Sequence, residues 1–367
     1  MKPATYVQRI ALNYRQSMAP FPDELDIAAE YMAGCPADRL YGGLLSLYRW
    51  MAAVYGAVAD SPQDLGLPGH PDVLPRSGSR YAASAQAFGA IPALIFALGL
   101  FGSPVEHDGQ VQLRVDPDRW TAYCRQAKIR KPQALLDVLG NHGLEVVPDA
   151  GSGTDLQVRF PDAPDIALAL PTFVKACCAF NKKVSPPPLE FCRADMRVMQ
   201  PVQGRKRLLP VTVADALRPL DEEQLGILAE LDRLVESLGF RVEVKCSGLN
   251  RGEWRGSYRS SKLGRTLFGF VVEESQLTVR IMIGETGRIL PYLEQCPAPL
   301  RQAFYAAHTC QACGHCKVGP VRVSLDGEPR RLCNYALFTV PNIRQESAAG
   351  MRILLEAQAG ILQETLA

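Results

Sequence analysis

The stretch that decides the fold of the carboxy-terminal half is Phe240-Arg241-Val242-Glu243-Val244-Lys245-Cys246. Apolar and charged residues alternate along it with a period of two, the pattern of a β-strand with one buried and one solvent-facing side. The same alternation recurs at 254–259, 266–272 and 277–283, and the short connection 273–276 predicts a hairpin between the last two. The sequence therefore predicts an antiparallel sheet of four strands.

Helical patterns flank these strands on both sides. Before them, Asp221 and Gln224 have the spacing of a capping box, and an apolar face at helical spacing follows until Gly239. After them, helices are expected at about 297–307 and 345–365. A helix followed by antiparallel strands is typical of an α+β layer with helices on one face. We therefore expect an α+β domain over residues 221–367.

A second, mainly helical α+β domain is predicted for residues 1–182. Helices are expected at 23–33 and 38–59, where apolar residues recur at helical spacing. A loop rich in Pro, Gly and Ser follows at 61–79, and an apolar helix then ends near Phe101.

The end of this domain has the order of a winged helix. A helix at 117–126, a turn, a second helix at 133–139 and strands at 144–147 and 156–160 follow one another. The second helix carries no basic residue that could meet phosphates or base edges. An ordinary packing unit is therefore the stronger interpretation of this winged-helix-like segment.

Residues 183–220 are predicted to connect the two domains. Three consecutive prolines, Pro186 to Pro188, begin a segment in which further prolines break helices and extend the chain. The segment is also basic, and its cations are Arg193, Arg197, Arg205, Lys206 and Arg207. It is expected to be a linker, or a clasp over a neighbouring domain.

Composition excludes several classes of protein. The chain has 367 residues, of which 47% are hydrophobic and 21% charged, unlike a disordered, collagen-like or coiled-coil chain. The net charge of +2 gives no global field for nucleic acid or membranes, so an electrostatic function must come from a local patch. The uncharged apolar stretch 91–101 is short for a membrane span, and the amino terminus lacks the order of a signal peptide. A cytosolic protein without a membrane partner is expected.

The most informative stretch is His308-Thr309-Cys310-Gln311-Ala312-Cys313-Gly314-His315-Cys316. With Cys333 it spells Cys-x2-Cys-x2-Cys-x16-Cys, and Asp326-Gly327 predicts a hairpin that returns Cys333 to the other three cysteines. Four thiolates suit tetrahedral Zn²⁺ in a closed structural site. Zinc is therefore the predicted cofactor, and it would be held by Cys310, Cys313, Cys316 and Cys333. His308 and His315 are substitute ligands or, more simply, exposed or neighbouring histidines.

Two other interpretations of the cysteines stay open. The same spacing holds cubane iron–sulfur clusters, although neither Cys316 nor Cys333 is followed by the proline common in bacterial ferredoxins. In addition, Cys313-Gly314-His315-Cys316-Lys317 resembles the active-site pentapeptide of protein disulfide isomerases. A thioredoxin fold needs a strand before that motif and a long helix starting at it, whereas here a helix precedes it and a hairpin follows.

Residues 245–265 form a basic segment with six cations, one acidic residue and hence a local charge of +5. The cations are Lys245, Arg251, Arg255, Arg259, Lys262 and Arg265. This charge predicts a surface for an anionic ligand or nucleic acid, with arginines on phosphates.

Aromatic residues are interleaved with this charge. Trp254 and Tyr258 alternate with the arginines, so that one face of the strand is aromatic and could stack on a base while the other is cationic. The simpler interpretation is a solvated face that pairs with glutamates on neighbouring strands. Those glutamates are Glu243, Glu273 and Glu274.

Catalytic motifs are absent from the sequence. It contains no Gly-x-Ser-x-Gly, no phosphate-binding Gly-x4-Gly-Lys-Ser/Thr and no His-Glu-x2-His. A binding or regulatory role is therefore favoured over catalysis, without excluding an enzyme whose catalytic groups converge from distant positions.

The last 150 or so residues resemble a group of uncharacterised bacterial proteins in which a helix and an antiparallel sheet precede a cysteine cluster and a terminal helix. The cysteines 310, 313, 316 and 333 and the run 254–283 carry this resemblance. It implies a metal site and no known activity. The expectation is a zinc-binding module for an anionic ligand or nucleic acid; an iron–sulfur or thiol redox protein and an interaction scaffold are the alternatives.

Overall fold

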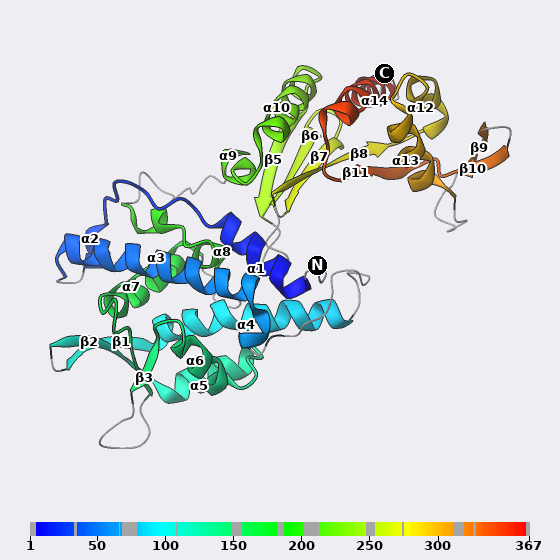
Figure 1. Ribbon diagram of the computed structural model, residues 1–367. Coiled ribbons are helices and arrows are strands. Elements are labelled where there is room, and N and C mark those ends of the chain that lie inside the picture. Colours follow the sequence, from blue (N-terminus) through cyan, green and yellow to red (C-terminus); the bar gives the residue numbers. More distant parts are fainter. Residues whose placement is uncertain are drawn as a thin grey trace. The chain divides into compact units, whose positions relative to one another are not determined.

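The structure is a computed structural model. It describes residues 5–32, 35–65, 67, 79–107, 109–147, 156–181, 187–201, 213–246, 254–273, 275–310, 319–325 and 328–364. The chain divides into two compact units, labelled element by element in Figure 1. Unit 1 contains the described residues up to 201, and unit 2 contains those from 213 onward.

Unit 1 is mainly helical. Its helices are α1 (Tyr6–Ser17), α2 (Ala29–Met32), α3 (Ala37–Asp60), η1 (Pro62–Leu65), α4 (Ser79–Phe101), α5 (Pro117–Gln126), α6 (Pro132–Gly140), α7 (Ile166–Phe180), α8 (Leu189–Cys192) and η2 (Met196–Met199). Its strands are β1 (Gly102–His107), β2 (Gln110–Val115), β3 (Glu145–Val147) and β4 (Leu156–Arg159). They form one antiparallel sheet in the order β1-β2-β4-β3.

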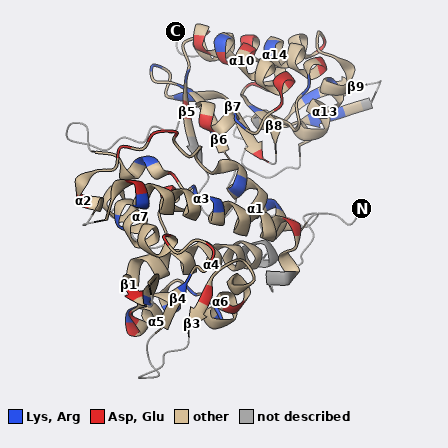
Figure 2. Ribbon diagram, turned by 60° about the vertical axis from the view of Figure 1, so that its left-hand side comes forward, with Lys and Arg blue, Asp and Glu red and all other residues tan. Residues whose placement is uncertain are grey.

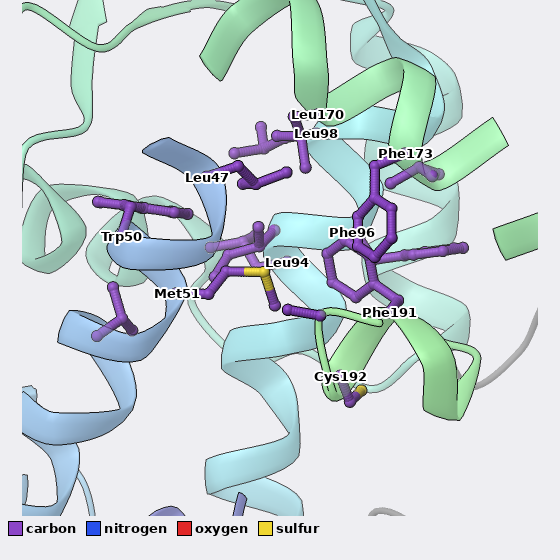
Figure 3. Close-up of a cluster of buried hydrophobic side chains, with 14 of the residues drawn as sticks. Leu47, Trp50, Met51, Leu94, Phe96, Leu98, Leu170, Phe173, Phe191 and Cys192 are labelled. Carbon is purple, nitrogen blue, oxygen red and sulfur yellow. The ribbon is translucent and has the colours of Figure 1, made fainter. Parts of the chain in front are cut away.

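Long helices supply most of the core of unit 1. Figure 3 shows apolar side chains of α3, α4, α7 and α8 packed together. Phe96 of α4 meets Phe191 of α8 edge-on with ring centroids 5.1 Å apart, and Phe173 of α7 stacks on the same ring at 5.7 Å. Interlocked aromatic rings of this kind bury a large apolar area and fix the spacing of the helices that carry them.

The proline-rich segment expected to be a linker contributes to this core. Phe191, Met196 and Met199 are fully buried, and two backbone hydrogen bonds tie the segment to the chain that follows α1. Ala19 N–H donates to Arg193 O at 2.8 Å, and Ala28 N–H donates to Met199 O at 2.9 Å. Residues 213–220 belong to unit 2, so only 202–212 separate the described parts of the two units.

Several elements of unit 1 differ from the sequence expectation. The helix expected at 23–33 is reduced to the short α2, and α1 was not expected at all. A capping box begins α1, because Gln8 N–H donates to Thr5 Oγ1 at 3.2 Å and Thr5 N–H donates to Gln8 Oε1 at 2.8 Å. Strands β1 and β2 were also missed, whereas the expected order of α5, α6, β3 and β4 is present.

Helix α4 is longer than the apolar stretch counted in the sequence. Among the described residues, its segment Ala83–Phe101 is long and apolar enough, by length and composition, to cross a membrane. Uncharged, alanine-rich turns at 83–90 precede the apolar stretch that begins at Ile91 and extend it. The segment is 72% buried against the rest of the chain, as a core helix is.

Unit 2 is an α+β layer. Its helices are α9 (Val213–Leu217), α10 (Glu222–Ser237), α12 (Thr286–Leu293), α13 (Ala298–His308) and α14 (Gln345–Glu364). Its strands are β5 (Arg241–Cys246), β6 (Trp254–Ser260), β7 (Arg265–Glu273), β8 (Gln276–Ile283), β9 (Val321–Leu325), β10 (Glu328–Leu332) and β11 (Ala336–Val340).

The main sheet of unit 2 has five strands, in the order β11-β8-β7-β6-β5. The expectation of four strands was wrong because β11 joins the edge of β8, with Phe338 opposite Ile281. Strands β9 and β10 form the expected hairpin separately, and their Asp-Gly turn lies outside the described residues. Helices α10 and α14 lie on one side of the main sheet (Figure 1), where Leu231 of α10 and Leu354 of α14 are buried.

Candidate functional sites

The two described cysteines of the predicted cluster lie at the base of the β9–β10 hairpin. Thr309 and Leu332 form an isolated antiparallel bridge between the end of α13 and the end of β10. Cys310 N–H donates to Arg331 O at 2.8 Å, and Cys333 N–H donates to His308 O at 2.6 Å. Residues alternate between the two faces of a pair of strands, so Cys310 and Cys333, which follow Thr309 and Leu332, lie on the same face. They are diagonal neighbours, for which the Cα atoms are about 7–8 Å apart.

A second element fixes the position of Cys333. Thr286, the fully buried first residue of α12, donates from its Oγ1 to the Cys333 carbonyl at 2.8 Å. The backbone of Cys333 is therefore attached to both α12 and the end of α13. Cys310 and Cys333 are half-buried, and Cys313, His315 and Cys316 lie outside the described residues.

The burial of His308 contradicts one of the two simpler interpretations, an exposed histidine, and is compatible with the other, a histidine that neighbours the ligands. His308 is fully buried, its ring stacks on Phe304 with centroids 3.9 Å apart, and burial lowers its pKa. Its Nδ1 lies 2.8 Å from the Phe304 carbonyl, and no described residue forms a hydrogen bond with its Nε2. A histidine whose Nδ1–H is fixed by a carbonyl has the Nε2 lone pair available, which is how many metal-binding histidines are oriented.

The second candidate site is the face of the main sheet opposite to helix α10, called the open face below. Trp254 and Tyr258 of β6 point to the helix-covered side and are buried, and the Tyr258 hydroxyl donates to Asp232 Oδ1 of α10. Burial and that hydrogen bond raise the pKa of Tyr258. The expectation that an aromatic residue of this strand could stack on a base is therefore wrong for both residues.

The predicted cations are distributed unequally over the open face. Arg255 is half-buried and Arg259 is exposed, both on the side of β6 away from the helices. Lys262 is exposed in the turn after β6, and Arg265 is exposed at the start of β7. Lys245 is placed by its backbone in β5, and Arg251 lies outside the described residues.

The strand register brings like charges together. Arg241 of β5 is the direct partner of Arg259, and Lys245 is the direct partner of Arg255. Glu243, which lies between the two basic residues of β5, is opposite Ser257. Like charges directly across an antiparallel pair destabilise a sheet, and Glu243 supplies one negative charge against the four cations at these positions, so the face keeps an excess of positive charge for an anion to balance.

For the glutamate-pairing interpretation, the register makes Glu243 a diagonal neighbour of both Arg255 and Arg259, within the range of cross-strand charge pairs. Glu273 is opposite Gln276 within the β7–β8 hairpin, and Glu274 lies outside the described residues. In these strand pairs, neither Glu243 nor Glu273 is the direct cross-strand partner of an arginine.

A pocket of about 790 Å³ extends from the open face. Three arginines line it, together with exposed apolar and aromatic side chains and one acidic residue, Glu285. The arginines are Arg255, Arg265 and Arg280, and the exposed apolar and aromatic residues are Met282, Tyr335 and Leu337. The pocket is also lined by Gln358, Ile361 and Leu362 of α14. Both signs of charge occur on α10 and α14 (Figure 2).

Arg241, Arg280 and Tyr335 also belong to this surface and were not predicted from the sequence. The signal for Arg280 was the alternation in β8, where it stands between buried Val279 and Ile281. Tyr335 gave no such signal because β11, the strand it precedes, was not predicted. Tyr335 is 52% exposed, which makes it the accessible aromatic ring of the pocket.

Comparisons with protein-family models, with curated proteins and with solved structures found no match to this chain.

Proposed function

We propose that unit 2 binds single-stranded nucleic acid on the open face, with phosphates at the arginines and a base stacked on Tyr335. The observation that carries this proposal is the register that sets Arg241 opposite Arg259 and Lys245 opposite Arg255. A cationic surface beside an exposed aromatic ring is the combination by which proteins bind single strands without sequence preference. The net charge of +2 gives no global field, so the attraction must come from a local cationic surface such as this face.

We further propose that Cys310, Cys313, Cys316 and Cys333 bind Zn²⁺ as a structural site. The isolated bridge between Thr309 and Leu332 supports this proposal, because it brings the first and last cysteine of the motif to one side of the hairpin base. A closed four-thiolate site contributes folding free energy and no chemistry. Its role would be to hold the hairpin against α13 at the edge of the unit that carries the open face.

We also propose that the protein acts in the cytoplasm, where cysteine thiols stay reduced.

Binding is tested with a fluorescent oligothymidylate of about 16 nucleotides by anisotropy at two salt concentrations. We expect the doubly charge-reversed protein Arg255→Glu/Arg259→Glu to lose binding. The matched control, Arg233→Glu/Arg352→Glu, makes the same charge change on exposed positions of α10 and α14 and is expected to bind as wild type. Unchanged binding by the first variant would refute the proposal.

The stacking contribution is tested separately. Tyr335→Ala is expected to weaken binding about ten-fold, since stacking one base contributes roughly 1–3 kcal/mol. Tyr292→Ala removes a comparably exposed tyrosine, at 42%, from α12 outside the pocket and is the control. If inorganic polyphosphate competes as well as the oligonucleotide and Tyr335→Ala has no effect, the face binds anions without recognising bases, and the nucleic-acid proposal is wrong.

The metal is tested by elemental analysis and a visible spectrum of tag-free protein purified without oxygen. About one zinc per chain and no colour are expected, and Cys333→Ser should lower the zinc content. Cys296→Ser, at a buried cysteine of unit 2 outside the motif, is the control and should retain it. Iron with sulfide and a brown colour would instead make the cluster an iron–sulfur centre.

A further inference from the structure

Unit 1 contains a pocket of about 580 Å³ between α4 and α6 that neither candidate site uses. Its α4 wall is made by Ala83, Gln86, Ala87 and Ala90, and its α6 wall by Ala134, Leu135 and Val138. Leu67 completes the apolar lining. The small alanine side chains of α4 leave space between the two helices, and the volume lies within the range of small-molecule sites.

One side of this pocket is cationic. Lys128, Arg130 and Lys131, all exposed, line it from the turn that joins α5 to α6. Among the described residues that line the pocket, none is acidic. An apolar cavity with cations along one side complements a ligand that has an anionic head on an apolar body.

The turn holds these cations in place. Ile129, between two of them, is buried, and its N–H donates to Cys124 O at 2.8 Å. Lys128 and Lys131 have φ values of 56° and 50°, in the left-handed region that lysine adopts only at an energetic cost. Strain of this kind persists where the surroundings fix the backbone, and here it presents two of the three cations at the pocket.

We propose that this pocket binds a small anionic amphiphile, that is, a carboxylate, sulfonate or phosphate on an apolar body. The three cations would pair with the head group, and the alanines of α4 with the apolar side chains of α6 would enclose the body. The inference is independent of the proposed function, because every residue it uses belongs to unit 1.

The full-length protein is titrated with 8-anilinonaphthalene-1-sulfonate and with N-phenyl-1-naphthylamine, which has the same ring system and no charge. The sulfonate should bind at one site and be displaced by decanoate better than by decanol. In Lys128→Gln/Arg130→Gln/Lys131→Gln, its affinity should fall at least about ten-fold, the loss expected when charge-assisted bonds are removed. The affinity of the uncharged probe should change by less than about two-fold, because apolar burial is preserved.

A second variant tests the apolar part. Ala87→Trp, which fills the space beside α4, should weaken both probes, whereas Ala122→Trp on the exposed side of α5 should weaken neither. The proposal is overturned if the triple glutamine variant binds the sulfonate like wild type, or if Ala87→Trp leaves the uncharged probe unaffected. It is also overturned if Arg255→Glu/Arg259→Glu abolishes sulfonate binding, because the dye would then occupy unit 2.

Discussion

Glu190 and Asp195 lie five positions apart in unit 1 and have opposite electrostatic surroundings. Asp195 is fully buried, and both of its oxygens accept bonds of 2.7 Å from Arg197, with Arg193 Nη1 at 3.7 Å. Glu190 is only partly buried, its pKa is raised chiefly by desolvation, and no described residue donates to its Oε2. The negative charge of Asp195 is thus balanced by Arg197, whereas the negative charge of Glu190 lowers the free energy of unfolding.

Glu190→Gln is expected to stabilise unit 1 at neutral pH. Because the folded protein holds the Glu190 proton more tightly than the unfolded chain, the stabilisation from this group is complete below its ordinary pKa of 4.5. It is lost as pH rises through the raised folded value. The advantage of glutamine should therefore appear above pH 4.5 and stay below about 1 kcal/mol, since part of the side chain remains solvated. Urea unfolding at several pH values measures this difference.

Asp195→Asn is the contrasting change. It should cost about 3 kcal/mol at neutral pH, because it removes the fully buried carboxylate that forms ion pairs with Arg197 and with the buried Arg193. Equal effects of the two substitutions on the free energy of unfolding would contradict the difference described here.

At the scale of elements, the sequence predicted the centre of unit 2 better than its edges. Strands β6 and β8 were predictable because buried and open positions alternate along both of them, whereas β7 is apolar at most positions. Strand β11 was missed because its sequence, Ala336-Leu337-Phe338-Thr339-Val340, shows no alternation of apolar and polar residues. Its strand geometry comes from pairing with β8, a tertiary effect that a local pattern does not contain.

The same limit applies to the sites. The cysteine spacing was readable along the chain, but the approach of Cys310 to Cys333 depends on where α13 ends relative to β10. The like-charge pairs depend on the register of β5 on β6, which a one-residue slip would change completely. In unit 1, the capping box at Thr5 was available in the sequence as Thr-x-x-Gln and was overlooked.

Two glycines of unit 2 should respond oppositely to alanine. A Cβ on Gly256 in β6 would lie 2.0 Å from Cε1 of the buried Phe270 ring, so Gly256→Ala should destabilise the unit by roughly 1–3 kcal/mol. A Cβ on Gly226 in α10 would have nothing within 4 Å, so Gly226→Ala should stabilise the helix by up to about 1 kcal/mol. Urea midpoints compare the two proteins. A loss of stability in both would show that α10 does not tolerate the side chain either.

At the scale of the whole molecule, the two units have separate apolar cores. The three tryptophans are divided between them, with Trp50 and Trp120 in unit 1 and Trp254 in unit 2. Single-unit reporters are therefore available: Trp50→Phe/Trp120→Phe leaves only the buried Trp254, and Trp254→Phe leaves only the tryptophans of unit 1.

These reporters should show independent responses. Removing the proposed zinc with a chelator should lower the urea midpoint reported by Trp254 and leave that of unit 1 unchanged. Asp195→Asn should lower the urea midpoint of unit 1 and leave that reported by Trp254 unchanged. A shift of both midpoints in either experiment would mean that the units unfold as one cooperative system.

Strand β11 lies more than 50 residues after its partner β8 in the sequence, and this separation matters during synthesis of the chain. The meander β5 to β8 can form as soon as it leaves the ribosome, but the outer side of β8 waits for a partner until residues 284–335 have also been synthesised. During that interval β8 is an edge strand with one apolar face, and its backbone can pair with another nascent chain. Translation that stops between those residues is therefore expected to release a product prone to self-association.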